Sequence, residues 1–307
     1  NPTNHRLWTA NSRVVGGDML KKIGNGGYAL GARAGQIRDV LFSSENFNEK
    51  SLLAIGLDDR ALFLKPWKSF ILTEVLNEAA LAKHVEFNEV KQLLSEDKEF
   101  KASINSASYR LVRNFRFNVR DLVFSELHNT FTNLSESFKF RSIRHQIEIP
   151  LWQLINEQPE NFMMLPLNSW QAVFNQALMK TITDMTSLDE EKQQPLNEAT
   201  WGQQNITKIK HPLSQSVPFI GKWLDMPETP LSGDSFMPKV QGKSFGASQR
   251  MVVSPGHEAQ GIFHMPTSQS GHPWSPYYHL GHQDWVEGKA SNFLPGPTKY
   301  QLTLLSY

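Results

Sequence analysis

Apolar residues repeat at helical spacing through the middle of the chain. Between residues 36 and about 204, apolar positions recur at the spacing that places them on one face of a helix. Segments 147–155 and 170–182 show this pattern clearly. A further helix that begins near Ser106 would gather four apolar side chains on one side: Tyr109, Val112, Phe115 and Val119. The region 36–204 is therefore predicted to be helical.

The two ends of the chain have a different pattern. Residues 1 to about 35 show little helical periodicity and are rich in glycine, so strands and loops are expected there. The clearest strand candidate is the segment 7–10. Most of the prolines and most of the alternating runs fall after about residue 205. Both ends are therefore predicted to be rich in strands.

A β-hairpin is predicted near the C-terminal end. Its strands would be 248–253 and 260–265, joined by a turn at 255–258. The order along the chain is then strands, helices and strands, without a repeat or a long low-complexity linker. This order predicts one α+β unit over residues 1–307, with strand-rich ends at 1–35 and 205–307 and a helical insertion between them.

The composition is that of a folded protein without a strong electrostatic bias. Of the 307 residues, 39% are hydrophobic and 11% aromatic, which argues against disorder. The net charge is +1 and no Lys- or Arg-rich run occurs, so neither a nucleic acid nor a membrane surface is an expected partner. The absence of cysteine excludes disulfides, thiolate catalysis and thiolate zinc sites.

Two short motifs match known patterns without the context that those patterns need. Residues 242–246 fit the G-x-S-x-G motif of serine hydrolases, but a strand rather than a helix is predicted after Ser244. Residues 24–29 satisfy a loose G-x-G-x-x-A, but no apolar strand precedes them and no βαβ unit follows. We therefore reject a nucleophile elbow at the first and interpret the second as a glycine-rich loop.

A group of late histidines suggests a metal-dependent hydrolase as an alternative function. Five of the ten histidines fall near the C-terminal end: His257, His264, His272, His279 and His282. His279 and His282 are three residues apart and could face the same way on a helix, with Asp284 nearby. Nearby prolines interrupt the local structure, however, and no H-E-x-x-H motif is present.

Several segments, in a consistent order, resemble one enzyme family. Near the beginning these are Asn1-Pro2, Trp8-Thr9-Ala10-Asn11-Ser12, the arginine-bearing segment 31–37 and the L-D-D-R-A sequence within 53–61. Near the end they are Gly233-Asp234, the segments 245–252 and 269–278, Trp285 and Gly288. Together they are similar to the C-terminal part of the large (beta) chain of penicillin amidases, a group of N-terminal-nucleophile hydrolases. Ser12 replaces the second Asn of the usual T-A-N-N sequence.

The resemblance implies a fold and a chemistry. The fold would be part of a four-layer αββα arrangement. The complete enzyme would hydrolyse linear amides through an acyl-enzyme formed on a Ser at a chain N-terminus, whose α-amine has a pKa near ~8 and acts as the base. Residue 1 is Asn, so the nucleophile is expected on a part of the protein outside this chain. By resemblance, Asn11 contributes to the oxyanion hole and Arg33 orients Asn11 and the nucleophile.

The resemblance also suggests partners, substrates and a compartment. The partners would be the remaining segments of one precursor, because a chain that begins at Asn1 without a signal peptide is expected to be a processed or truncated piece. The substrates would be small N-acyl compounds, such as β-lactams with acyl side chains or acyl-homoserine lactones. No cofactor is required, a structural calcium is possible although Lys21-Lys22 stand where an acidic ligand is expected, and the location would be periplasmic or secreted. A stable but inactive fragment is the remaining alternative.

Overall fold

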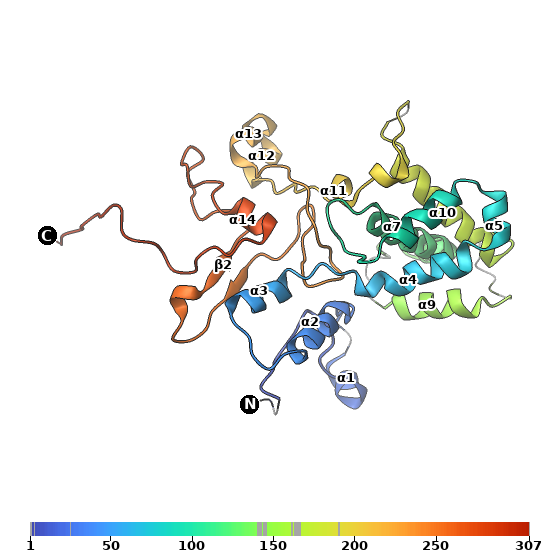
Figure 1. Ribbon diagram of the computed structural model, residues 1–307, viewed down its shortest axis with the longest axis horizontal. Coiled ribbons are helices and arrows are strands. Elements are labelled where there is room, and N and C mark those ends of the chain that lie inside the picture. The colour runs from blue at the N-terminus through green and yellow to red at the C-terminus, as the bar shows by residue number, and fades with distance from the viewer. Residues whose placement is uncertain are drawn as a thin grey trace.

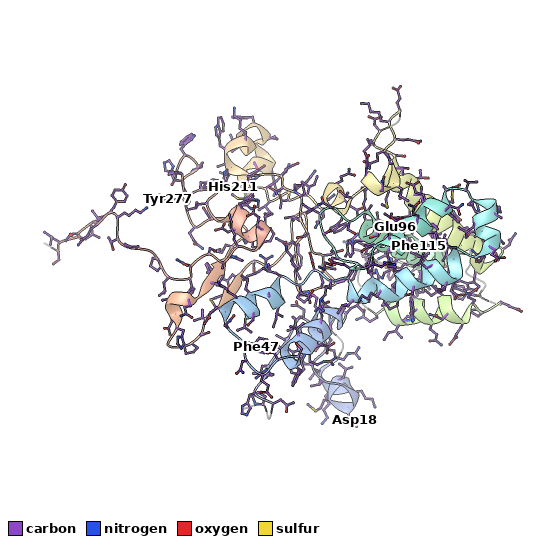
Figure 2. The ribbon with its side chains drawn as sticks, viewed as in Figure 1. Asp18, Phe47, Glu96, Phe115, His211 and Tyr277 are labelled. Carbon is purple, nitrogen blue, oxygen red and sulfur yellow. The ribbon has the colours of Figure 1, made fainter. Side chains whose placement is uncertain are left out.

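The computed structural model describes residues 2, 4–24, 26–139, 143, 146–160, 162, 167–189 and 191–306. Asn1, the first residue of the family-like segments, lies outside the described residues. The molecule is elongated, with a helical lobe at one end and a loop-rich C-terminal region at the other (Figure 1). The N-terminal helices lie along one side between them, and Figure 2 shows Asp18 of this part projecting away from the lobe that contains Phe115.

The helical lobe is built around two long helices that pack against each other, α7 (Ala107–Val123) and α10 (Trp170–Thr186). The side chains of Ser106 and Ser169 accept hydrogen bonds from backbone N–H groups in the first turns of these helices, so each start is capped. The other elements of the lobe are η1 (Leu62–Leu64), α4 (Lys65–Phe70), η2 (Ile71–Val75), α5 (Glu78–Lys83), α6 (Phe87–Glu96), α8 (Ser125–Leu134), α9 (Glu148–Glu157), η4 (Leu196–Glu198) and α11 (Trp201–Gln204). The helices predicted at 106–119, 147–155 and 170–182 are thus confirmed.

The main core lies inside this lobe and is rich in aromatic side chains. Trp67, Tyr109 and Phe115 are each at most 1% exposed. The ring of Trp67 meets those of Phe115 and Trp152 edge to face, with centroids 6.3 and 5.2 Å apart. Its indole N–H donates to a carboxylate oxygen of Glu148 at 3.0 Å. Apolar burial and the buried carboxylate of Glu148 therefore hold α4, α7 and α9 together.

The N-terminal region consists of helices and loops, so the prediction of a strand-rich segment 1–35 is wrong. Its helices are α1 (Gly17–Ile23), α2 (Ala32–Phe42) and, beyond it, α3 (Glu49–Gly56). The predicted strand at 7–10 does not form, and the β-structure among the described residues of 1–35 is one parallel bridge between Ser12 and Ala29. A strand needs a neighbouring strand for its backbone hydrogen bonds, and no described segment lies alongside 7–10 as one.

The C-terminal region contains the predicted hairpin. Strands β1 (Arg250–Val252) and β2 (Ile262–His264) pair antiparallel, with Arg250 opposite His264. A turn and the short helix η6 (Glu258–Gln260) connect them. With this two-stranded sheet and many helices, the fold is α+β.

The rest of the C-terminal region is less strand-rich than predicted. Among its described residues the β-structure beyond the hairpin is limited to isolated bridges. Short helices occur instead: α12 (Pro212–Ser216), η5 (Pro218–Ile220), α13 (Gly221–Leu224) and α14 (His282–Glu287). In this region, polar side chains bind backbone carbonyls that a neighbouring strand would otherwise pair. The buried amide of Asn205 donates to the carbonyls of Leu231, Gly233 and Gln241.

The molecule exposes an unusually large surface. Its accessible area is 19,191 Å², whereas a compact monomer of its 35.0 kDa mass exposes about 13,000 Å². Many large apolar side chains are among the exposed ones, including Leu7, Met19, Ile23, Phe219, Tyr300, Leu302 and Leu304. No described helix has the length and hydropathy needed to cross a membrane.

Candidate functional site

The structure brings Asn11 and Arg33 into direct contact. One guanidinium nitrogen of Arg33, Nη2, donates to the side-chain oxygen of Asn11 at 3.0 Å and to the carbonyl of Ala10 at 3.1 Å. Arginine offers only donors, so the amide oxygen of Asn11 must be the atom that faces it. The amide NH₂ group of Asn11 is therefore left to donate to something else.

Two backbone features and one side-chain contact hold Asn11 in place. Its φ is +60°, a left-handed conformation that Asn tolerates better than most residues. Its carbonyl accepts a hydrogen bond from the backbone N–H of Ala29 at 2.9 Å, next to the bridge between Ser12 and Ala29. Further back along the chain, the guanidinium of Arg6 donates to carbonyls in the last turn of α2 and just beyond it, including that of Glu45 at 2.8 Å. The segment that carries Asn11 is thus anchored on both sides.

Arg33 lies in the first turn of α2 and is half-buried. Burial lowers the pKa of its guanidinium. A cation in the first turn opposes the helix dipole, so helix stability does not explain an arginine here. Buried Gln36 on the same helix donates to the carbonyl of Arg60 at 3.2 Å, which fixes α2 against the helical lobe.

A cavity of about 600 Å³ opens beside this pair. Asn11 and Arg33 line it on one side, and residues of α7 and of the loop around Phe236 line it on the other. The lining residues from the far side are Arg113, Arg116, Phe117, Arg120, Ser235 and Phe236. None of these residues belongs to the motifs or family-like segments of the sequence. The i, i+3, i+7 spacing of the three arginines in a predicted helix was the available signal, because it places them on one face.

This arrangement can stabilise a negative charge. The NH₂ group of Asn11 is a neutral donor, and Arg33 behind it adds a positive field in a partly desolvated place. Ser235 contributes a hydroxyl, but that hydroxyl donates at 3.1 Å to its neighbour Asp234, whose carboxylate is also bound by Arg113 and Tyr109. Within the described part of the chain, the site therefore resembles an oxyanion site that lacks an activated nucleophile.

The late histidines do not assemble a metal site. His282 Nδ1 lies 2.6 Å from the carbonyl of Pro266, His264 Nε2 contacts the carbonyl of Lys289, and His272 Nδ1 accepts a backbone N–H. Nowhere in the described ranges do three or more His, Asp or Glu side chains form a group that could hold a metal. These histidines therefore do not fit the metal-dependent alternative.

The two remaining motifs lie in loops. Residues 242–246 form a tight loop closed by a bridge between Gln241 and Gly246, with no helix after Ser244. Gly24 ends α1, Asn25 lies outside the described residues, and α2 rather than a βαβ unit follows Ala29. The acidic pair of the L-D-D-R-A sequence has a structural role. The carbonyl of Asp58 accepts a hydrogen bond from the backbone N–H of Lys239, and that of Asp59 accepts one from Ala102. The pair therefore connects the lobe to the C-terminal region.

Comparison with known proteins identifies the family. None of the curated proteins compared with the chain matches it. The model of the penicillin amidase family matches residues 1–299, nearly the whole chain. Members of that family hydrolyse amide bonds, and the chain belongs to the penicillin amidase family.

Proposed function

We propose that this chain supplies the oxyanion-binding part of an acylase whose N-terminal Ser nucleophile lies on a separate segment of the same precursor. The observation that carries the proposal is the contact between Arg33 and the side-chain oxygen of Asn11. It turns the NH₂ group of Asn11 toward whatever occupies the neighbouring cavity. The two residues that the family resemblance singles out are 22 positions apart in sequence, yet they meet here.

The proposed reaction has two steps. The Ser oxygen attacks the amide carbon while the α-amine of the same Ser accepts the hydroxyl proton. Asn11 donates to the resulting oxyanion, the C–N bond breaks, and the leaving amine takes the proton from the α-amine. Water then attacks the acyl ester, passes a proton to the α-amine, and releases the carboxylic acid and the free Ser.

The exposed surface supports a companion segment. The accessible area exceeds that of a compact protein of this mass by roughly half. Most exposed large apolar side chains lie before residue 43 or after residue 212, and in the tail Leu302 and Leu304 are 84% and 85% exposed. A companion segment would cover such side chains and, in the complete enzyme, would supply the strands of a four-layer αββα fold.

The wider proposal concerns substrates and compartment. The substrates are small N-acyl compounds, among them β-lactams with acyl side chains and acyl-homoserine lactones. The complete enzyme is periplasmic or secreted. No cofactor takes part in the chemistry, and a structural calcium would draw carboxylate ligands from other segments, since no three His, Asp or Glu side chains group together among the described residues.

The composition of the purified enzyme tests the proposal directly. Expression of the precursor should yield a chain that begins with Ser, either separate from this segment or continuous with it as one large chain, and a denaturing intact-mass spectrum should show it. A sulfonyl fluoride should label that Ser and abolish amide hydrolysis. Labelling within residues 1–307 instead, or full hydrolysis by residues 1–307 alone, would refute the proposal.

Arg33 is proposed as a positioning residue, and a double-mutant cycle tests that role. Arg33→Ala should lower kcat about 10- to 100-fold with little change in KM, because it acts through Asn11 on the transition state. In an Asn11→Ala background the same change should have little further effect, since residues that act as a unit are not additive. Arg33→Lys should restore part of the rate. Additive losses would show that Arg33 acts independently of Asn11.

A further inference from the structure

Helices α12 and α13 form an element with polar side chains inside and apolar side chains outside. Ser214 is 5% exposed, and its hydroxyl donates to the carboxylate of Asp225. The same carboxylate accepts the backbone N–H of His211 at 2.8 Å, so it ties the two ends of the element together. Large apolar side chains of this element are exposed instead: Leu213, Phe219 and Trp223. Exposed apolar side chains that gather in one place mark a contact site.

The loop 272–280 lies beside this element and exposes further aromatic side chains. The hydroxyl of Tyr278 donates to the carbonyl of Leu224 at 3.0 Å, and residues of both segments line one cavity of about 300 Å³. Figure 2 shows His211 and Tyr277 near each other and far from Phe115. The exposed side chains of the two segments form what we call the aromatic surface: Leu213, Phe219, Trp223, Trp274, Tyr277 and Leu280.

The segments that carry the aromatic surface contain cationic side chains and no acidic one. No Asp or Glu occurs in residues 206–224 or 259–283, whereas the first of these segments contains exposed Lys208, Lys210 and Lys222. The Nζ atom of Lys222 lies 4.0 Å from the centre of the Trp223 ring. The net charge of the whole chain, +1, gives no reason to expect a membrane partner. The fold nevertheless gathers positive charge locally, next to exposed aromatic rings.

We infer that the aromatic surface docks on an anionic phospholipid surface, with Phe219, Trp223 and Trp274 among the headgroups and upper acyl chains. The lysines then face the lipid phosphates. Trp is typical of this level of a bilayer, because its ring is apolar and its N–H is polar. Each Lys near an anionic leaflet strengthens binding about fivefold. This docking function is separate from the proposed amide hydrolysis.

The position and the charge of the aromatic surface favour lipid over a companion segment. Asn11 contacts Arg33 on α2, and α12 and α13 lie at the opposite edge of the molecule from α1 and α2 (Figure 1). A segment that brings a Ser to Asn11 therefore covers the side of α2. Lysine is also depleted at protein interfaces, whereas Lys208, Lys210 and Lys222 accompany this surface.

Vesicle flotation of the complete protein tests the inference. The protein should float with vesicles of equimolar phosphatidylcholine and phosphatidylglycerol, and much less with vesicles of phosphatidylcholine alone. High salt should weaken the binding to the anionic vesicles, because it screens the attraction between Lys side chains and lipid headgroups.

Substitutions at exposed positions assign the binding to this surface. Phe219 and Trp274 are 71% and 76% exposed, so Phe219→Ser and Trp274→Ser remove no core packing. Each should lower the partition coefficient about tenfold, equivalent to about 1.4 kcal/mol, because less apolar area enters the bilayer. Lys222→Gln should lower it about fivefold for the anionic vesicles and leave the weak binding to phosphatidylcholine unchanged.

Matched control variants lie in the helical lobe. Val85→Ser removes an apolar side chain that is 76% exposed, and Lys91→Gln removes an exposed cation of α6. Both should leave the partition coefficient within about twofold, as expected for surface changes away from the bilayer.

The outcomes decide the inference without reference to hydrolysis. Absence of flotation with the anionic vesicles would overturn it. Flotation that Phe219→Ser, Trp274→Ser and Lys222→Gln all leave within about twofold would overturn it as well. A companion segment or a second copy of the chain would then be the partner that covers the aromatic surface. Because amide hydrolysis is not measured, failure of the proposed acylase would leave this result unchanged.

Discussion

Replacement of Asn11 by alanine is expected to lower kcat for amide hydrolysis about 100- to 1,000-fold, the usual effect of removing one oxyanion donor. The reason is geometric. Arg33 occupies the oxygen of the Asn11 amide and leaves only the NH₂ group to meet the oxyanion. The side chain of Asn11 is exposed in this chain, so the substitution removes no core packing. Steady-state kinetics of the processed enzyme measure the effect.

One further variant distinguishes loss of the Asn11 NH₂ donor from loss of the contact with Arg33, and a second variant is the control. Asn11→Asp keeps the shape of the side chain and its contact with Arg33 but has no NH₂ group, so its kcat should fall at least as far. Asn4→Ala, also at an exposed position of the N-terminal segment, should leave kcat within about twofold, as expected for a surface change. If Asn11→Asp retained most of the rate, Asn11 would not be the oxyanion donor.

Replacement of Glu148 by alanine is expected to destabilise the helical lobe by about 3–5 kcal/mol, because it strands a buried cation. Glu148 binds the guanidinium of Arg116, which is 4% exposed, and accepts the indole N–H of Trp67 at 3.0 Å. Its loss would leave both donors without their acceptor. Urea unfolding, followed by tryptophan fluorescence, measures the change.

An exposed ion pair provides the control for this stability prediction. Asp184→Ala breaks the pair between Lys180 and Asp184 on α10, whose side chains are 57% and 47% exposed. Its effect should stay below about 1 kcal/mol. Glu148→Gln keeps an acceptor for Trp67 and should fall between the two. A loss of less than about 1 kcal/mol for Glu148→Ala would show that the pair with Arg116 does not stabilise the lobe.

The helices of the lobe were predictable because their signals are local. Apolar spacing located α7, α9 and α10, and a serine cap marks the start of α7 at Ser106. The hairpin of β1 and β2 was predictable for the same reason, since its strands and turn lie within about twenty residues of each other in the sequence. Local signals of this kind do not depend on how distant segments meet.

Strand content at the ends was not predictable in the same way. An alternating or glycine-rich segment becomes a strand only when a partner completes its backbone hydrogen bonds. Segment 7–10 has no such partner among the described residues. In the C-terminal region, the side-chain amide of Asn205 donates to carbonyls that a neighbouring strand would otherwise bind. The same residues could adopt either structure, and tertiary contacts decide between them.

The site shows the same division. Segments at both ends of the chain identify the family without knowledge of the fold, and with it the candidates Asn11 and Arg33. Only the tertiary structure decided that Arg33 takes the amide oxygen of Asn11, and that arginines from α7 line the same cavity. The physical reason is that these contacts join residues many positions apart. Their geometry depends on how α2 and α7 are placed, which no short stretch of sequence encodes.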